Sequence, residues 1–146
     1  MYIVTRLFKE LTLQQLYAVL QLRSEIFVVE QNCVYQDIDG KDEKALHVLG
    51  FKSDKLVAYT RIFKPGDYFN EAAIGRVAVK HDERKHGYGH EILEASVVAI
   101  EREFTTSSIR LSAQTYLINF YKMHGFVVDG EEYLEDGIPH INMCKA

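Results

Sequence analysis

The residues best placed to do chemistry are a basic pair and two glycines at the start of a long apolar-patterned segment. Arg84 and Lys85 are followed by Gly87, Tyr88 and Gly89, directly before a helical pattern. The first N–H groups of a helix lack intrahelical partners and lie at the positive end of its dipole. Because glycine has no β-carbon, a phosphate can approach these groups closely, and the basic pair adds charge-assisted hydrogen bonds. The pattern predicts a phosphate-binding loop, and its structural alternative is an ordinary tight turn.

A second segment, residues 120–126, reads Phe-Tyr-Lys-Met-His-Gly-Phe. The strand-like residues 77–79 before the Arg-x-x-Gly-x-Gly run, together with this later segment, resemble the GNAT superfamily of N-acetyltransferases. Three further stretches, residues 22–31, 35–40 and 136–141, resemble its ElaA-like subgroup. The resemblance covers nearly the whole chain. It implies a fold and a co-substrate, acetyl-coenzyme A (acetyl-CoA), but no known acceptor.

The resemblance also implies where acetyl-CoA binds. The family's [Gln/Arg]-x-x-Gly-x-[Gly/Ala] motif, which here begins at Arg84, grips the pyrophosphate, while backbone groups of the fourth strand face the pantetheine. Gln114 stands where many members carry an asparagine, so either Gln114 or Asn119 is a candidate contact. The implied cofactor-binding residues are Val77, Val79, Arg84, Lys85, His86, Gly87, Tyr88, Gly89, His90, Gln114 and Asn119.

Acetyl transfer from a thioester requires that the amine lose a proton and that the departing thiolate gain one. Tyr121 matches the family's tyrosine thought to protonate the thiolate, and a phenol with a reference pKa of ~10 suits this task. Its structural alternative is aromatic packing against the sheet. For the base we consider Glu30, which is expected to be partly buried after an apolar run, and His47. The structural alternative for Glu30 is a salt bridge to Arg23 or Arg76. The alternative for His47 is a structural hydrogen bond within a strand.

The acceptor side is assigned from the stretches that carry the subgroup resemblance. Asp37 and Asp39, which are also candidates for the base, lie in an acidic stretch that could attract a cationic acceptor or simply be a solvated loop. His140, in the last strand, is expected to line the acceptor pocket. The acceptor itself, a small-molecule amine or a protein lysine, is left open. The implied substrate-binding residues are Arg23, Phe27, Asp37, Asp39, Arg76 and His140.

Other groups of residues that could form a different kind of site have weaker support in the sequence. His86 and His90 have the spacing of metal ligands on a helix, but His86 precedes the expected helix start and no glutamate follows it as in zincins, so no metal is expected. Cys33 has no adjacent base that would make it a nucleophile. The third glycine of a Rossmann turn and a Walker lysine motif are missing. The remaining alternative to an enzyme is a catalytically idle GNAT-fold module that binds acyl-CoA, or a partner protein, as a sensor.

The order of elements predicts an α/β GNAT fold in a single domain, residues 1–146. We expect a mixed, mostly antiparallel, twisted sheet of about six to seven strands, splayed between the fourth and fifth, with helices on both faces. Thr12 and Gln15 predict a capping box, and Gly125 suits a left-handed helix end. Strands are expected at 2–8, 45–51, 56–63, 72–79 and 109–113 and around the turn 136–139, and helices after Thr12 and at 24–30, 88–104 and 115–124.

Composition narrows the possible partners. The chain has 146 residues, of which 47% are hydrophobic and 26% charged, and these are ordinary globular values. A net charge of −4 without a basic run argues against a nucleic acid or an anionic membrane as partner. Cys33 and Cys144 form neither a disulfide framework nor a zinc spacing. Without a signal-peptide pattern or a membrane-spanning run, we expect a cytoplasmic protein. The oligomeric state stays open, with a homodimer among the options.

Overall fold

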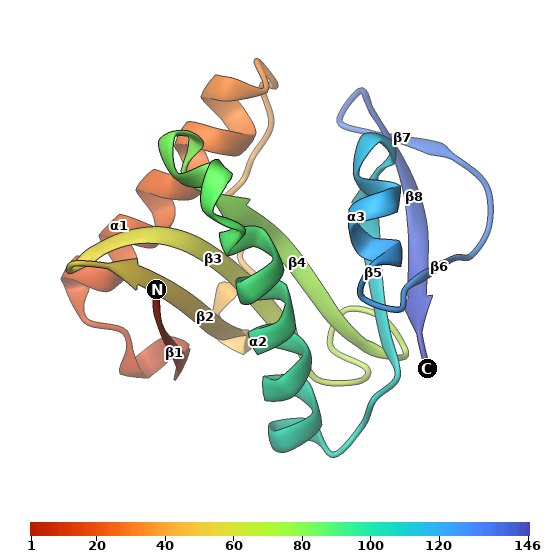
Figure 1. Cartoon of the computed structure of the whole chain (residues 1–146), viewed down its shortest axis with the longest axis horizontal. Helices are drawn as coiled ribbons and strands as arrows, with labels where there is room; N and C mark the ends of the chain where they lie inside the picture. Colours follow the sequence, from red (N-terminus) through yellow and green to blue (C-terminus); the bar gives the residue numbers. More distant parts are fainter.

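The computed structural model describes residues 1–146, which form one eight-stranded sheet flanked by helices (Figure 1). The strand order is β1-β2-β3-β4-β5-β8-β6, and β7 also pairs with β8. All pairs are antiparallel except β4 with β5, so the predicted mixed sheet is confirmed. The strands are β1 Tyr2–Leu7, β2 Leu46–Lys52, β3 Lys55–Phe63, β4 Ala72–Val79, β5 Ile109–Gln114, β6 Val127–Val128, β7 Tyr133–Glu135 and β8 Ile138–Lys145.

The first helix, α1 (Leu13–Arg23), begins at the predicted capping box. Thr12 Oγ1 accepts a hydrogen bond from the Gln15 N–H, and Gln15 Oε1 accepts one from the Thr12 N–H, each at 3.0 Å. Two otherwise unpartnered donors are thereby satisfied. The chain continues without a break into a π-helical segment, Ser24–Glu30, whose wider turns replace the short helix expected there. A π-helical turn of this kind is often found at functional sites.

Two helices lie on opposite faces of the sheet. Helix α2 (Tyr88–Phe104) buries Ile92, Leu93 and Ile100 in the larger core on one face. Helix α1 packs Val19 and Leu22 into a second core on the other face. The expected helices on both faces are therefore confirmed. No helix of the structure has the length and apolar character needed to cross a lipid bilayer.

Helix α3 (Ile118–Lys122) is shorter than the helix expected at 115–124, because Thr115–Leu117 form a 3-10 turn before it. Gly125 then adopts a φ of +87°, the left-handed conformation predicted for it. Further 3-10 turns are Phe8–Glu10, Asp42–Lys44 and His81–His86.

Strands β4 and β5 separate soon after they meet, as predicted. They pair only at Ala72 with Ile109 and at Ala73 with Arg110, and the two strands then diverge (Figure 1). The divergence coincides with a distortion of β4, in which Arg76 has a φ of +51°. The register between β3 and β4 also shifts between Tyr59 and Arg61. A left-handed residue in a strand is costly, about 1–2 kcal/mol, and such residues cluster at functional sites.

Candidate functional site

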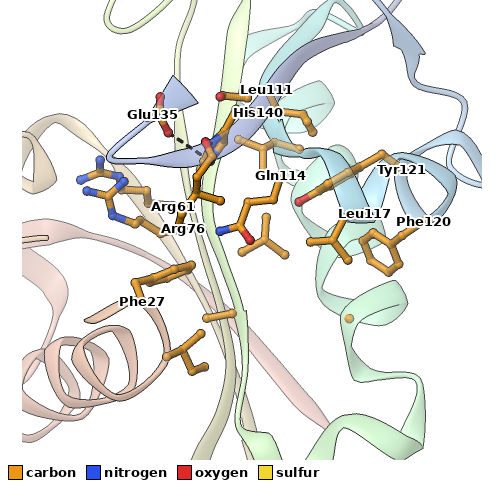
Figure 2. Close-up of a pocket in the computed structure, with 18 of the residues that line it drawn as sticks. Phe27, Arg61, Arg76, Leu111, Gln114, Leu117, Phe120, Tyr121, Glu135 and His140 are labelled. Atoms are coloured by element: carbon orange, nitrogen blue, oxygen red, sulfur yellow. Dashed lines mark hydrogen bonds and ion pairs between the residues drawn. The ribbon is translucent and has the colours of Figure 1, made fainter. Parts of the chain in front are cut away.

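A cavity of about 460 Å³ occupies the gap between β4 and β5 (Figure 2). The π-helical segment contributes to one side of it, strands β3 and β4 to its floor, and β5, α3 and β8 to the other side. Its volume falls within the range of small-molecule sites, and its lining is mostly apolar with a few charged groups. The splayed strands thus create a binding site instead of a continuous sheet.

The structure brings twelve of the predicted site residues to this cavity and leaves the others outside its lining. Those that line it are Phe27, Glu30, Arg76, Val77, Val79, Arg84, Gly87, Gly89, His90, Gln114, Tyr121 and His140. Those outside it are Arg23, Asp37, Asp39, His47, Lys85, His86, Tyr88 and Asn119. Lys85, His86 and Asn119 are exposed at the surface, so a contact with the outer part of a long cofactor stays a prediction for them.

The predicted phosphate-binding loop opens α2 as expected. Gly87 precedes the helix with a φ of +75°, a conformation that favours glycine, and a β-carbon there would meet no neighbouring atom within 4 Å. Gly89 differs, because its missing β-carbon would lie 3.4 Å from the ring of Phe120. The structure therefore shows one glycine whose positive φ shapes the turn and a second whose added β-carbon would only come into contact with Phe120. The close approach of a phosphate to Gly87 and Gly89 stays a prediction.

Arg84, at the same end of the cavity, is held by Glu30. The Arg84 guanidinium donates to both carboxylate oxygens of Glu30, at 2.7 and 2.9 Å, and its Nε donates to the carbonyl of Val79 at 3.0 Å. The side chain of Glu30 is 34% exposed, and its ion-pair partner is Arg84 instead of Arg23 or Arg76. An anion that binds Arg84 must compete with this carboxylate.

Tyr121 lies inside the cavity wall with its ring packed against Phe126 and Phe120. The residue is 5% exposed, yet its hydroxyl makes no hydrogen bond within the protein and points into the cavity in Figure 2. Burial, followed by the nearby Tyr116, raises the pKa of this phenol above its ordinary value. The hydroxyl is thus a protonated donor at neutral pH without an internal acceptor.

His140 also lines the cavity, from β8. Its Nδ1 donates to the carbonyl of Ile138 at 2.7 Å, and its Nε2 lies 3.3 Å from Glu135 Oε2. Because a carbonyl can only accept, Nδ1 carries a proton and Nε2 is the nitrogen that can gain or lose one. Figure 2 shows His140 and Glu135 across the cavity from Phe27.

Beside the end of the cavity that Arg76 lines lies a network of three arginines and three aspartates. Arg23 Nε donates to Asp37 Oδ2 at 2.9 Å, and its Nη1 donates to Asp42 Oδ1 at 2.8 Å. Arg61 donates from Nη1 to Asp42 at 3.0 Å and from Nη2 to Asp39 at 2.6 Å. Arg76, which pairs with Asp37 and Asp39, completes the network. The charges of its three arginines and three aspartates balance.

The network changes the interpretation of the acidic stretch. Asp37 and Asp42 are buried, at 6% and 8% exposed, so they are neither a solvated loop nor a surface that attracts cations. Burial alone would raise the pKa of Asp42, but hydrogen bonds from Arg23 and Arg61 hold that pKa below its ordinary value. Arg23 is fully buried and does not reach the cavity. Arg23, Asp37 and Asp39 therefore lie behind the residues that line the cavity.

His47 is also a structural residue in this geometry. It is 1% exposed and does not line the cavity. Its Nε2 lies 2.9 Å from the carbonyl of Asp42, so Nε2 carries the proton, while Nδ1 lies 2.6 Å from the hydroxyl of Tyr59 and accepts from it. Both ring nitrogens are occupied, which argues against a role as base.

This burial makes the stability of the fold depend on pH. Burial lowers the pKa of His47, so its neutral form is favoured in the folded state. Neutral His47 contributes its full stabilisation at pH values above the pKa of histidine in the unfolded chain, ~6.5. As the pH falls from that value to the lower pKa of His47 in the folded protein, this contribution is lost. We expect the free energy of unfolding to fall less between pH 7.5 and 5 in His47→Gln than in the wild type. Urea titrations at both pH values measure this, and equal pH slopes in the two proteins would contradict it. His81→Gln, at an exposed side chain, is the control whose slope should match the wild type.

Contacts between distant segments bridge the cavity near Gln114, which lies between Tyr121 and Arg76 in Figure 2. Gln31 and Gln114 exchange two hydrogen bonds through their side-chain amides, at 3.2 and 3.3 Å. The thiol of Cys33 donates to the carbonyl of Asp136 at 3.3 Å. Both contacts join the N-terminal half of the site to β5 and the β7–β8 turn. Gln114 is therefore already paired across the gap.

Comparisons with known proteins agree with this architecture. A family model described as an acetyltransferase (GNAT) domain matches residues 10–146. The ElaA protein of Escherichia coli is 46% identical over 138 residues, 93% of this chain and 90% of ElaA. The chain belongs to the GNAT acetyltransferase family.

Solved structures support the GNAT assignment and the ElaA-like resemblance. The crystal structure of ElaA superposes with a TM-score of 0.91 at 41% identity, over the full length of both chains. An acyl-CoA N-acyltransferase from Pseudomonas aeruginosa gives a TM-score of 0.93 at 40% identity, also over both full chains. An aminoglycoside 6'-N-acetyltransferase complexed with coenzyme A gives 0.68 at 15% identity, covering 97% of this chain and 96% of that one, which shows a shared fold.

Several residues of the GNAT cavity were missed by the sequence reasoning. They include Gln31, Tyr35, Arg61, Tyr68, Phe120 and Glu135. Gln31 and Tyr35 stood inside or beside the subgroup stretches and could have been included. Arg61 gave no signal, because an arginine in the middle of an apolar strand reads equally well as a residue on a solvent face. No group of three or more histidine, cysteine, aspartate or glutamate side chains is placed to hold a metal ion.

Proposed function

We propose that this protein is an N-acetyltransferase that moves an acetyl group from acetyl-CoA to a primary amine by direct attack in a ternary complex. The observation that carries the proposal is the cavity between β4 and β5, which extends from the Gly87 loop to the free hydroxyl of Tyr121. Membership of the GNAT family implies N-acetyltransferase activity. The identity of the acyl donor and the amine nature of the acceptor are our inference.

The loop end of the cavity suits the diphosphate of acetyl-CoA. The N–H groups at the start of α2 and the guanidinium of Arg84 supply donors and positive charge to an anion there. The pantetheine would then run between the diverging strands, against Val77 and Val79, whose side chains contact the core that includes α2. Backbone N–H groups of β4 that β5 leaves unpaired can stabilise the negative charge that develops on the thioester oxygen.

Two side chains are suited to the proton transfers. We assign Tyr121 as the acid that protonates the departing thiolate, because its hydroxyl is free and faces the cavity. For the base we favour His140, since its Nδ1 is used by the carbonyl of Ile138 and its Nε2 is left to accept a proton from the amine. His140→Gln is expected to lower kcat/KM and to abolish its decline at acidic pH. A pH–rate profile measures this, and an unchanged acidic limb would exclude His140.

Glu30 should weaken cofactor binding, because it competes with the cofactor for Arg84. We expect Glu30→Gln to bind acetyl-CoA about threefold to fivefold more tightly, with a gain that shrinks as salt is added. Calorimetry at low and high ionic strength provides the measurement. Glu101→Gln removes the same charge at an exposed site on α2 and should leave affinity unchanged. Equal or weaker binding by Glu30→Gln would show that Arg84 does not contact the cofactor. An accompanying loss of kcat would return Glu30 to the role of base.

A direct test of the function is acceptor-dependent release of free CoA thiol. Wild-type protein at saturating acetyl-CoA should release thiol with at least one member of an amine panel and release little without amine. Binding of acetyl-CoA with no thiol release across free amino acids, polyamines and lysine peptides would favour the idle acyl-CoA-binding module instead. A cytoplasmic location and a homodimer stay predictions from the sequence.

A further inference from the structure

Arg61 and Arg76 are the two arginines of the arginine–aspartate network that line the cavity, and Arg76 is the more exposed of them. Arg76 lies in β4 at the point where the strand is distorted, and its backbone has a φ of +51°, which residues other than glycine rarely adopt. Its side chain is 18% exposed, whereas those of Arg23 and Arg61 are 0% and 1% exposed. The strained backbone therefore places the most exposed guanidinium of the network at the cavity.

The Arg76 guanidinium is held from behind by two aspartates. Its Nε lies 2.7 Å from Asp37 Oδ1, and its Nη2 donates to the carbonyl of Asp37 at 3.1 Å and to Asp39 Oδ2 at 3.5 Å. Asp37 is fixed in turn by Arg23 and by the hydroxyl of Tyr35. The ring of Tyr35 also stacks near the guanidinium carbon, at 5.6 Å. The orientation of Arg76 is thus determined before any substrate binds.

Nη1 of this guanidinium makes no hydrogen bond, and it is not among the buried atoms that lack one. The buried Nε, although it lies beside Asp37 Oδ1, has no hydrogen bond either. Arg61 has no such free end, because its Nη1 and Nη2 are bound by Asp42 and Asp39. A preorganised, half-buried donor of this kind is matched by an anionic oxygen, since charge-assisted hydrogen bonds are about twice as strong as neutral ones.

Building on the proposed function, we propose that the acetyl acceptor is an amine that also bears a carboxylate, as an amino acid does, and that Arg76 Nη1 binds the carboxylate. The opposite wall has the complementary charge for the amine. Glu135 and Asp136, from the β7–β8 side, line the same cavity. Figure 2 shows Glu135 and Arg76 at the same end of the site, on the far side of Gln114 from Tyr121.

This arrangement discriminates between classes of acceptor. A polyamine or a lysine side chain in a protein offers no anion to Nη1 and would place a second cation or a neutral chain against it. A carboxylate leaves the amine of the same molecule free to lie near Glu135. The aromatic rings of Phe27 and Tyr35 provide apolar surface for the part that joins the two groups.

The test uses bisubstrate conjugates, because they report acceptor binding without turnover. The sulfur of CoA is joined through a CH2–CO link to the nitrogen of glycine, β-alanine or phenylalanine, and each conjugate is paired with its carboxamide. By calorimetry, at least one carboxylate conjugate should bind about tenfold or more tightly than its carboxamide. Arg76→Gln should remove this ratio by weakening only the carboxylate conjugate. Arg84→Gln, the matched control, should weaken both members of a pair by the same factor.

The outcomes separate this inference from the function on which it rests. Conjugates that bind more tightly than CoA, with equal affinity for carboxylate and carboxamide in every pair, would leave the acetyltransferase standing and overturn the carboxylate acceptor. Conjugates that bind no more tightly than CoA would overturn both, because no acceptor site would then exist. Should Arg76→Gln fail to fold, the ratio within each pair in the wild-type protein decides the question alone.

Discussion

Replacing Tyr121 by phenylalanine is expected to lower kcat by about 10²-fold while cofactor affinity hardly changes. The substitution removes only a hydroxyl that makes no internal hydrogen bond, so neither packing nor folding should suffer. Without this phenol the thiolate must take its proton from water. The measurement is turnover at saturating acetyl-CoA, over a pH series, with an amine from the panel.

The control for this experiment is Tyr17→Phe, which removes the same hydroxyl from an exposed position on α1 outside the cavity. Its kcat should equal that of the wild type. A kcat for Tyr121→Phe that also equals the wild-type value would reduce Tyr121 to a packing residue. Burial raises the pKa of this phenol, so the wild type should keep its acid protonated well above neutral pH.

Replacing Arg23 by alanine should destabilise the fold by about 3–5 kcal/mol, the usual result of removing one partner from a buried ion pair. Arg23 is fully buried and bridges Asp37 and Asp42 at 2.9 and 2.8 Å. Its loss leaves both carboxylates with fewer donors in a poorly solvated place. Denaturant titration at pH 7 gives the free energy of unfolding directly.

The matched control is Arg102→Ala, because Arg102 pairs with Glu103 on the exposed side of α2. Exposed pairs contribute about 0–1 kcal/mol, so this variant should unfold close to the wild type. A loss at Arg23 no larger than the loss at Arg102 would contradict the view that the network is a rigid base for the acceptor site.

Much of the fold could be predicted because its signals are local. The capping box at Thr12 and the apolar stripe of α2 depend on residues within a few positions of one another. The π-helical form of Ser24–Glu30 could not be predicted, since its apolar pattern is compatible with an ordinary helix. β6 was missed because two residues are too few to make a strand pattern. Pairing with β8, which is distant in sequence, is what makes it a strand.

The site residues, like the fold, were predictable where their signal is local and not where it depends on distant contacts. The loop at Arg84 and the Phe-Tyr segment were recognised from short motifs, and both reach the cavity. The acidic stretch was misjudged, because Asp37 and Asp39 meet their partners Arg61 and Arg76 only through the folding of β3 and β4. The pairing of Glu30 with Arg84 across more than fifty positions was equally invisible in the sequence. Contacts between distant charged residues require the structure.

The most direct test of the account follows the acetyl group itself. Wild-type protein is mixed with acetyl-CoA that is radiolabelled in its acetyl group, with and without an amine mixture that contains glycine, phenylalanine, a polyamine and a lysine peptide. We predict that the label leaves CoA only when amine is present, that it appears on an amine nitrogen, and that one free thiol is released for each acetyl group. Label that stays on bound CoA, or that accumulates on the protein at Cys33, would contradict direct transfer within a ternary complex.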